Sequence, residues 1–397
     1  MVYQQAQPRP TPKQEDEGPF IPPHPSEFGL EYNLDEEEME GMEEDEMGDE
    51  KYDSEGEDYQ EDEPRPVPPP QPRAMAAPPL HDRDSELHKL RPYQFRPSKQ
   101  EWKHIPTSGI KTNQYKRGGE YKKPCYELRI ITWNIDFNSD RHEERLDEAL
   151  LHIEDILRCK EDREPEPCCI LFQEVHAEVL PYLLENEWVR RWFVVTPHRV
   201  EKWPRGQRYG NVTLVARSLD IAECHILHFG PSAMGRTALC VNIKLHYPGT
   251  DEKAVIAVVN THLESLTQES PVRPKQLDLC SRFLRRMGVN GGVIAGDMNS
   301  IGREDAMIGK NLGLKDSWRK GDVEAGHTWG YQGNEGFPNA RLDKIFYLPG
   351  MSYKVDEPKR IGVGLKIQGD SDAAMWVSDH YGLETTLRML KPRSNSS

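Results

Sequence analysis

The chain has 397 residues, and its net charge of −16 reflects 67 acidic and 51 basic side chains. This length allows one large domain or two smaller ones. No run of about 18 apolar residues occurs and the N-terminal sequence has no apolar segment, so we expect neither a membrane span nor a signal peptide. The seven cysteines form no CxxC pairs, which argues against a cysteine-rich zinc site and favours a reducing compartment.

Most of the negative charge lies at the N-terminus. Residues 1–87 carry 26 acidic and 6 basic side chains, a net charge of −20, and they are rich in proline. Such a segment cannot bury enough apolar surface to offset its chain entropy. We therefore predict a disordered acidic tail over residues 1–87. The tail keeps the protein soluble, or it binds a protein partner or mimics nucleic acid.

The next segment, residues 88–124, is basic, with 10 basic and 2 acidic side chains and a net charge of +8. Its aromatic residues lie between the charges, as in proteins that stack on bases and neutralise phosphate. The alternative is an extended linker or arm that packs along the domain. The remaining residues are nearly balanced at −4, so the whole-chain charge does not exclude a polyanionic partner.

From Cys125 onward, the apolar patterns predict an α/β domain over residues 125–391, followed by a disordered tail over residues 392–397. Apolar positions at helical spacing predict helices, and short apolar runs predict strands. The predicted elements are, in order, strand 128–135, helix 145–161, strands 168–175, 209–218, 238–247 and 254–263, helix 275–288, and strands 291–299, 340–348 and 376–390. Pro248–Gly249 predicts a hairpin turn. This order indicates packed mixed sheets with helices outside.

Several of these strands end in oxygen-bearing side chains. Glu174 follows CCILF, and a carboxylate in this position is a hard ligand suited to Mg²⁺ or Mn²⁺. Asp297 and Asn299 follow GGVIAG two residues apart, so their side chains face the same way and could orient a water and hold a phosphate oxygen. Asn134 and Asp136 repeat this spacing. Taken singly, GDMN fits a turn equally well, and each of the other segments fits a turn or a cap better than a site.

Two histidines complete the pattern. His262 follows a buried strand and could donate to a phosphate oxygen, whereas His380 could transfer a proton or stabilise an anionic transition state. Neighbours on a strand point to opposite faces, so Asp379 is a poor partner for His380, and Asp343 on another strand is a better one. Together, these residues indicate metal-assisted attack of water on a phosphoester.

The motifs TWNID, QEV, THLES, GDMN, HTW and SDHYGL occur in this order over residues 126–390. With them the chain resembles the endonuclease/exonuclease/phosphatase superfamily. That resemblance implies a DNase I-like four-layer α/β sandwich, two packed mixed β-sheets flanked by helices, with a divalent-metal site. Within the superfamily the motifs look most like the tyrosyl-DNA phosphodiesterase 2 branch, of the fungal type. Enzymes of that branch hydrolyse the 5′-phosphotyrosyl bond between a trapped topoisomerase and DNA.

The resemblance also implies a role for each matching residue. In the metal site, Glu174 would ligate Mg²⁺ (Mn²⁺ is the alternative), with Asp136 and Asn134 around it. The other implied roles are activation of the attacking water by Asp297, its placement by Asn299, phosphate contacts from His262 and His380, orientation of His380 by Asp343, and DNA-groove contacts from Trp329 and Arg303.

The resemblance leaves other substrates open. On the same fold the alternatives are an RNA deadenylase or other ribonuclease, an abasic-site endonuclease, a sphingomyelinase and an inositol phosphatase. A non-catalytic binding module that works through its acidic tail is a further alternative. The presence of Glu174, Asp297 and His380 favours an enzyme. We predict a monomer that acts on DNA in the nucleus, or also in the cytoplasm, and is not secreted.

Overall fold

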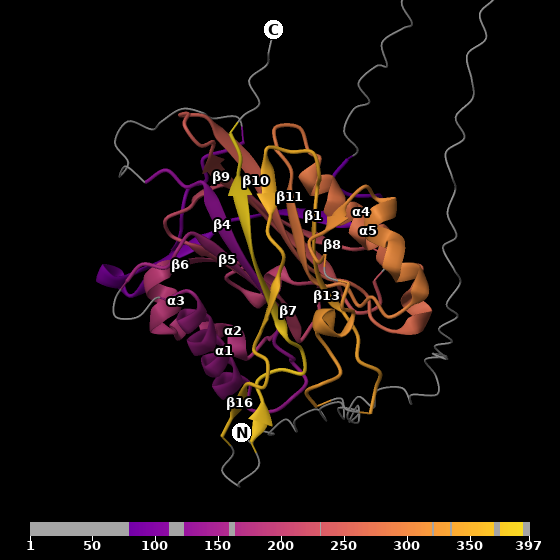
Figure 1. Ribbon diagram of the computed structural model, residues 1–397. Coiled ribbons are helices and arrows are strands. Elements are labelled where there is room, and N and C mark those ends of the chain that lie inside the picture. The colour runs from indigo at the N-terminus through magenta and orange to yellow at the C-terminus, as the bar shows by residue number, and fades with distance from the viewer. Residues whose placement is uncertain are drawn as a thin grey trace, which may run out of the picture. The chain divides into compact units, whose positions relative to one another are not determined.

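The computed structural model describes residues 79–110, 123–158, 163–230, 232–319, 321–333, 336–368 and 374–391. Of the tail predicted over residues 1–87, residues 1–78 lie outside these ranges, as does the tail predicted over residues 392–397. Residues 79–87 are described, and the last two of them belong to strand β1 (Glu86–Leu90), so the tail was predicted to extend too far. Two β-sheets pack face to face, with helices on the outer sides (Figure 1). The helices are α1 (His142–Ile156), α2 (Val179–Glu185), α3 (Glu187–Trp192), α4 (Arg273–Leu284) and α5 (Ile308–Asn311). This arrangement confirms the predicted fold class.

One sheet has seven strands in the order β1-β8-β9-β10-β11-β13-β12. Its strands are β1 (Glu86–Leu90), β8 (Asp220–His228), β9 (Thr237–His246), β10 (Lys253–His262), β11 (Gly292–Asp297), β13 (Asp343–Tyr347) and β12 (Lys315–Asp316). The predicted turn at Pro248–Gly249 is confirmed, because β9 and β10 pair antiparallel on either side of it.

The other sheet has nine strands in the order β14-β18-β4-β5-β7-β6-β2-β3, with β15 also paired to β18. Its strands are β14 (Tyr353–Val355), β18 (Gly382–Met389), β4 (Glu127–Asn134), β5 (Cys168–His176), β7 (Tyr209–Ala216), β6 (Phe193–Thr196), β2 (Tyr93–Arg96), β3 (Glu101–His104) and β15 (Lys359–Ile361). In the described residues a small separate ribbon pairs β16 (Lys366–Ile367) with β17 (Met375–Trp376).

The apolar run of β10 explains why the sheets pack in layers. Ile256 and Val258 belong to the core between the sheets, whereas Ala257 and Val259 belong to the core beneath α4. Successive side chains of a strand point to opposite faces. A strand that is covered on both faces therefore needs a continuous apolar sequence rather than an alternating one.

The folded region begins earlier than the predicted boundary at Cys125. Residues 88–124 were expected to form a linker or an arm, but β1 pairs with β8 and β2 pairs with β6, so this segment adds strands to both sheets. Leu90 and Phe95 are buried there. The boundary was placed too late because these strands are short and charged on their exposed faces, as is common at sheet edges.

Other differences concern two short helices and one longer strand. The helices α2 and α3 were not predicted, since 7 and 6 residues are too few to establish a helical period. Asn186 caps α3 by accepting a hydrogen bond from the Val189 N–H. The nine-residue strand β8 was also missed. Within the described part of the chain, no helix is long and apolar enough to cross a membrane.

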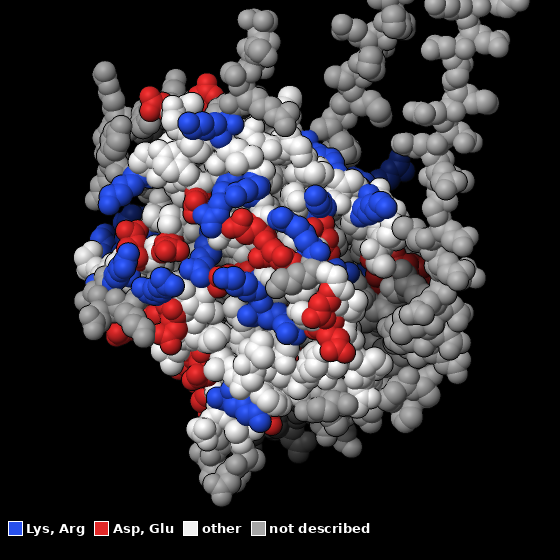
Figure 2. Space-filling model, in the orientation of Figure 1, with Lys and Arg blue, Asp and Glu red and all other residues white. Residues whose placement is uncertain are grey.

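The charged surface is mixed on the face shown in Figure 2. Lys and Arg side chains there are interspersed with Asp and Glu. This agrees with the nearly balanced charge of the sequence after residue 124. Among the described residues on this face, basic side chains thus do not form one continuous positive surface.

Candidate active site

Two pairs of parallel strands, one in each sheet, end at the same place. In one sheet β4 runs parallel to β5, and in the other β10 runs parallel to β11. Parallel neighbours present their carboxyl ends on the same side, which is where α/β proteins assemble their sites. The predicted residues Asn134, Glu174, His262 and Asp297 lie at or near these four ends.

Glu174 is directed into the site by an irregularity in β5. The register between β5 and β7 shifts between Phe172 and Val175, and Glu174 has a left-handed φ of 57°. A bulge of this kind re-aims a side chain, and a left-handed non-glycine residue is strained. One carboxylate oxygen of Glu174 accepts from the backbone N–H of Phe137 at 3.1 Å. The strain is therefore located at a residue that the sequence selects as a metal ligand.

Asn134 connects the two sheets at the site. Its side-chain Nδ2 donates to Glu174 Oε1 at 3.1 Å and to Asp297 Oδ2 at 3.1 Å. Its Oδ1 accepts from the Asp136 N–H at 3.0 Å. Because both donor positions of the amide are used, Asn134 fixes the separation of the two carboxylates.

Three of the site residues lie side by side on neighbouring strands of the seven-stranded sheet. In the strand register, Asp297 lies opposite His262 on β10 and opposite Asp343 on β13. Gly296 permits this packing: a Cβ atom there would lie 1.8 Å from the Thr261 carbonyl oxygen, and its φ is 143°. The glycine of the GDMN motif thus allows β10 and β11 to lie close together beside the reactive groups.

His262 is held in one tautomer. Arg236 Nη1 lies 2.7 Å from His262 Nδ1, and since arginine can only donate, Nδ1 accepts and the proton resides on Nε2. That Nε2 lies 3.4 Å from Asp297 Oδ2 and 3.8 Å from Glu174 Oε1. Burial and the neighbouring Arg236 lower the pKa of His262 well below its usual value. His262 is therefore a neutral N–H donor.

His380 differs from His262 in its charge. Its Nδ1 lies 2.8 Å from Asp343 Oδ2, and its Nε2 lies 3.7 Å from Asp297 Oδ2. Burial lowers the pKa of His380, but the Asp343, Asp379 and Asp297 carboxylates outweigh it and raise this pKa well above the usual value. His380 is therefore an imidazolium, and Asp343 is its partner, as the sequence predicts.

The loops around the site are tied down by buried groups that the sequence analysis missed. The Arg145 guanidinium on α1 is buried and donates to the carbonyls of Ile135, Asp136 and Val377, which joins the loop after β4 to the loop before β18. Trp133 Nε1 donates to the His380 carbonyl at 3.0 Å. Arg145 lies within the predicted helix, and no motif in the sequence distinguishes it.

Arg236 was also missed. It lies just before β9, donates to His262, and contacts Tyr209 through a hydrogen bond of 3.2 Å. Tyr209 stacks on Phe137 with ring centroids 3.8 Å apart. A single arginine ahead of an apolar strand gives no sequence signal for this role.

The other predicted residues lie around this centre with different partners. Asp136 accepts from the backbone of Asn138 and from Ser139, and lies 3.7 Å from Arg145, so its carboxylate holds its own loop. Asn299 donates to the Leu263 carbonyl at 3.0 Å, and its N–H donates to Asp297 Oδ1 at 2.9 Å.

Trp329 and Arg303 were predicted to line a DNA groove. Trp329 is half-buried, forms a backbone bridge with His380, and donates its indole N–H to Asp379 Oδ2 at 3.0 Å. Its indole therefore contacts Asp379, the residue before His380 in the chain. The side chain of Arg303 lies outside the described part of the chain, so its predicted role is not tested.

The donor set fits a hard divalent cation. Glu174 and Asp297 each offer a carboxylate oxygen as a ligand atom, and these atoms lie within 4.8 Å of one another. Burial and the nearby Asp136 carboxylate raise the pKa of Glu174 to about 7, against the lowering effect of Arg236. The Glu174 carboxylate thus lacks compensating positive charge, which a cation with a preference for oxygen ligands would supply.

Comparison with known proteins agrees with this geometry. A model of the Endonuclease/Exonuclease/phosphatase family matches residues 131–380, more than half of the chain. The chain belongs to this family. It is 23% identical over 275 residues to a 5′-tyrosyl-DNA phosphodiesterase of Caenorhabditis elegans, covering 66% of this chain and 67% of the relative. It is 25% identical over 233 residues to the Caenorhabditis briggsae enzyme of the same name, covering 56% of this chain and 60% of that relative.

Solved structures share the fold. The D. rerio TDP2 complexed with single strand DNA product matches with a TM-score of 0.52 at 20% identity, covering 66% of this chain and 99% of that one. The humanized D. rerio TDP2 with 14 mutations matches with a TM-score of 0.50 at 21% identity, with the same coverage. These relatives are nematode and fish proteins, so the fungal-type assignment is not supported.

Proposed function

We propose that this family member is a Mg²⁺-dependent phosphodiesterase that hydrolyses 5′-phosphotyrosyl bonds in DNA. The proposal rests on the groups that lie together around Asp297. The neutral imidazole of His262 and the imidazolium of His380 both face the Asp297 carboxylate, and the Asp343 carboxylate holds His380. The names of the two nematode relatives support the choice of substrate.

Asp297 is the group we assign to the attacking water. Its Oδ2 faces Asn134, His262 and His380, and its Oδ1 accepts from the Asn299 N–H. These contacts fix the carboxylate in one orientation. As the water oxygen bonds to phosphorus, Asp297 takes the proton that the water releases.

The two histidines divide the task of holding the phosphate. His380 contributes a full positive charge, fixed by Asp343, where negative charge accumulates on the phosphate oxygens. His262 contributes a neutral N–H donor fixed by Arg236. Neither group needs to reorganise during the reaction, which is the condition for effective electrostatic stabilisation.

The tyrosyl leaving group needs little proton donation from the site. The bond that breaks joins phosphorus to a tyrosyl oxygen, and a phenol has a pKa of about 10. Such an oxygen can leave with little proton donation. Mg²⁺, held by the Glu174 and Asp297 carboxylates, would neutralise charge on the phosphate oxygens.

The surroundings support a nucleic-acid substrate. Trp329 is half-buried and donates to Asp379, next to His380 in the chain, where its ring could stack on a base. We extend the proposal to DNA as the partner of this monomer and to the nucleus as its place of action. Asp136 then acts by holding its own loop, from which the Phe137 N–H donates to Glu174, and Asn299 acts by fixing Asp297.

The proposal is tested with a substrate panel and Mg²⁺: a 5′-phosphotyrosyl oligonucleotide, poly(A), an abasic duplex and sphingomyelin. We expect the highest kcat/KM on the phosphotyrosyl oligonucleotide, loss of activity in EDTA, and loss of activity in Asp297→Asn. A higher kcat/KM on another member refutes the substrate but keeps the phosphoesterase. No hydrolysis of any member, with the chain folded, refutes the enzyme.

A further inference from the structure

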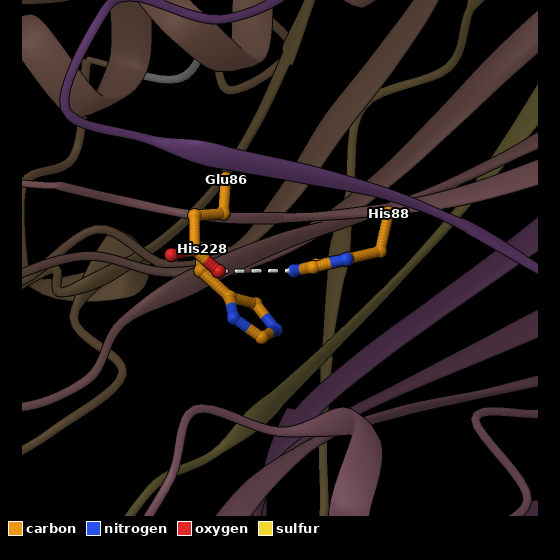
Figure 3. A group of neighbouring side chains, drawn as sticks. All are labelled: Glu86, His88 and His228. Atoms are coloured by element: carbon orange, nitrogen blue, oxygen red, sulfur yellow. Dashed lines mark ion pairs between the residues drawn. The ribbon is translucent and has the colours of Figure 1, made fainter.

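A second cluster of potential ligands lies on the edge of the seven-stranded sheet. It consists of Glu86 and His88 on β1 and His228 on β8 (Figure 3). Glu86 and His88 are two residues apart, so their side chains point to the same face. In the antiparallel pairing of β1 with β8, Glu86 lies directly opposite His228, which places His228 on that face as well.

The three side chains are close enough to share one ion. Each offers one ligand atom, and these atoms lie within 4.8 Å of one another. His88 Nε2 is 3.3 Å from Glu86 Oε2 (Figure 3), and the rings of His88 and His228 have centroids 4.8 Å apart at 56°.

His228 is already oriented by the backbone. Its Nε2 lies 2.9 Å from the carbonyl oxygen of Lys202, so Nε2 carries the proton and Nδ1 carries the free lone pair. Metal-bound histidines commonly donate their other N–H to a carbonyl in this way.

We propose that Glu86, His88 and His228 bind one Zn²⁺ ion that fastens β1 to β8. Two imidazoles and one carboxylate favour Zn²⁺ over Mg²⁺ or Ca²⁺, which prefer oxygen ligands. Three protein ligands leave a fourth position for water. The site shares no residue with Glu174, His262 and Asp297.

The position of β1 gives the ion a structural role. This strand is at the end of its sheet, and β8 is its neighbour in the strand order. It is also the first strand of the described chain. An ion shared by both strands resists separation of β1 from the sheet, because opening the pair would break the coordination.

The test uses the full chain, freed of metal and kept reduced, and titrates it with ZnCl₂ by calorimetry while hydrogen exchange follows the β1 amides. His88→Ala removes an exposed ligand without disturbing the core. His228→Ala removes the second imidazole. His104→Ala, an exposed histidine on β3 in the other sheet, is the matched control.

We expect the wild type and His104→Ala to bind one Zn²⁺ more than either ligand variant, or to bind it at least about tenfold more tightly. At a zinc concentration about 100 times Kd, exchange of amides in residues 86–90 should slow by about 100-fold in the wild type. This slowing should vanish in His88→Ala. Equal binding in the wild type and His88→Ala, or zinc-independent exchange in β1, overturns the proposal. Similar slowing with MgCl₂ overturns the choice of metal.

Discussion

Replacing Asp343 by Asn removes the charge that holds His380 as an imidazolium. The Nδ1–Oδ2 distance is 2.8 Å, and at an effective dielectric constant of about 20 this corresponds to an attraction of about 6 kcal/mol. Part of it offsets the burial of both groups, and breaking such a pair typically costs about 3–5 kcal/mol. If this loss falls on the transition state, kcat decreases by about 10²- to 5 × 10³-fold.

The assay is kcat on the 5′-phosphotyrosyl oligonucleotide across pH at saturating Mg²⁺. A raised His380 pKa keeps the imidazolium at high pH, so in Asp343→Asn the activity should be lost at a lower pH than in the wild type. Asp316→Asn, which loses an ion pair with Arg341 on the same sheet, is the matched control and should retain its pH profile. An unchanged alkaline limb in Asp343→Asn refutes the reasoning.

Three further predictions concern the metal, the strand contact and a buried lysine. Glu174→Gln should raise the Mg²⁺ concentration for half-maximal activity at least about tenfold, measured by Mg²⁺ titration; an unchanged requirement contradicts the role of Glu174. Gly296→Ala should abolish activity because its Cβ meets the Thr261 carbonyl, whereas Gly249→Ala, with a φ of 79° but open space, should retain it; equal activities would contradict the steric account. Burial lowers the pKa of Lys344 to about 8 from 10.5, so the wild type gains stability as pH rises between these values. Lys344→Met should therefore raise Tm by a few degrees at pH 7, and this difference should disappear above about pH 10.5; a lower Tm at pH 7 contradicts it.

The sequence alone predicted those features that depend on a local pattern of apolar and polar residues. Continuous apolar runs predicted the strands that both sheets bury, since each such strand must be apolar on both faces. Their polar residues at the strand ends identified Glu174, Asp297 and His262 as candidate site residues. The alternation of strand side chains even predicted that Asp343, and not the adjacent Asp379, orients His380. Short strands carry a weaker signal, which is why β1–β3 were missed. The nine-residue β8 lies inside its sheet and was missed because Glu223 and His225 interrupt its apolar sequence.

The tertiary structure decided what each of these groups is bonded to. Arg236 and His262 lie 26 residues apart but share a hydrogen bond that sets the tautomer of the histidine. Arg145 joins loops that are more than 200 residues apart. The sequence determined the set of reactive side chains, because local patterns place them at strand ends. Only the packing of the two sheets determined the charge states of these side chains, because burial and partners distant in the chain set each pKa.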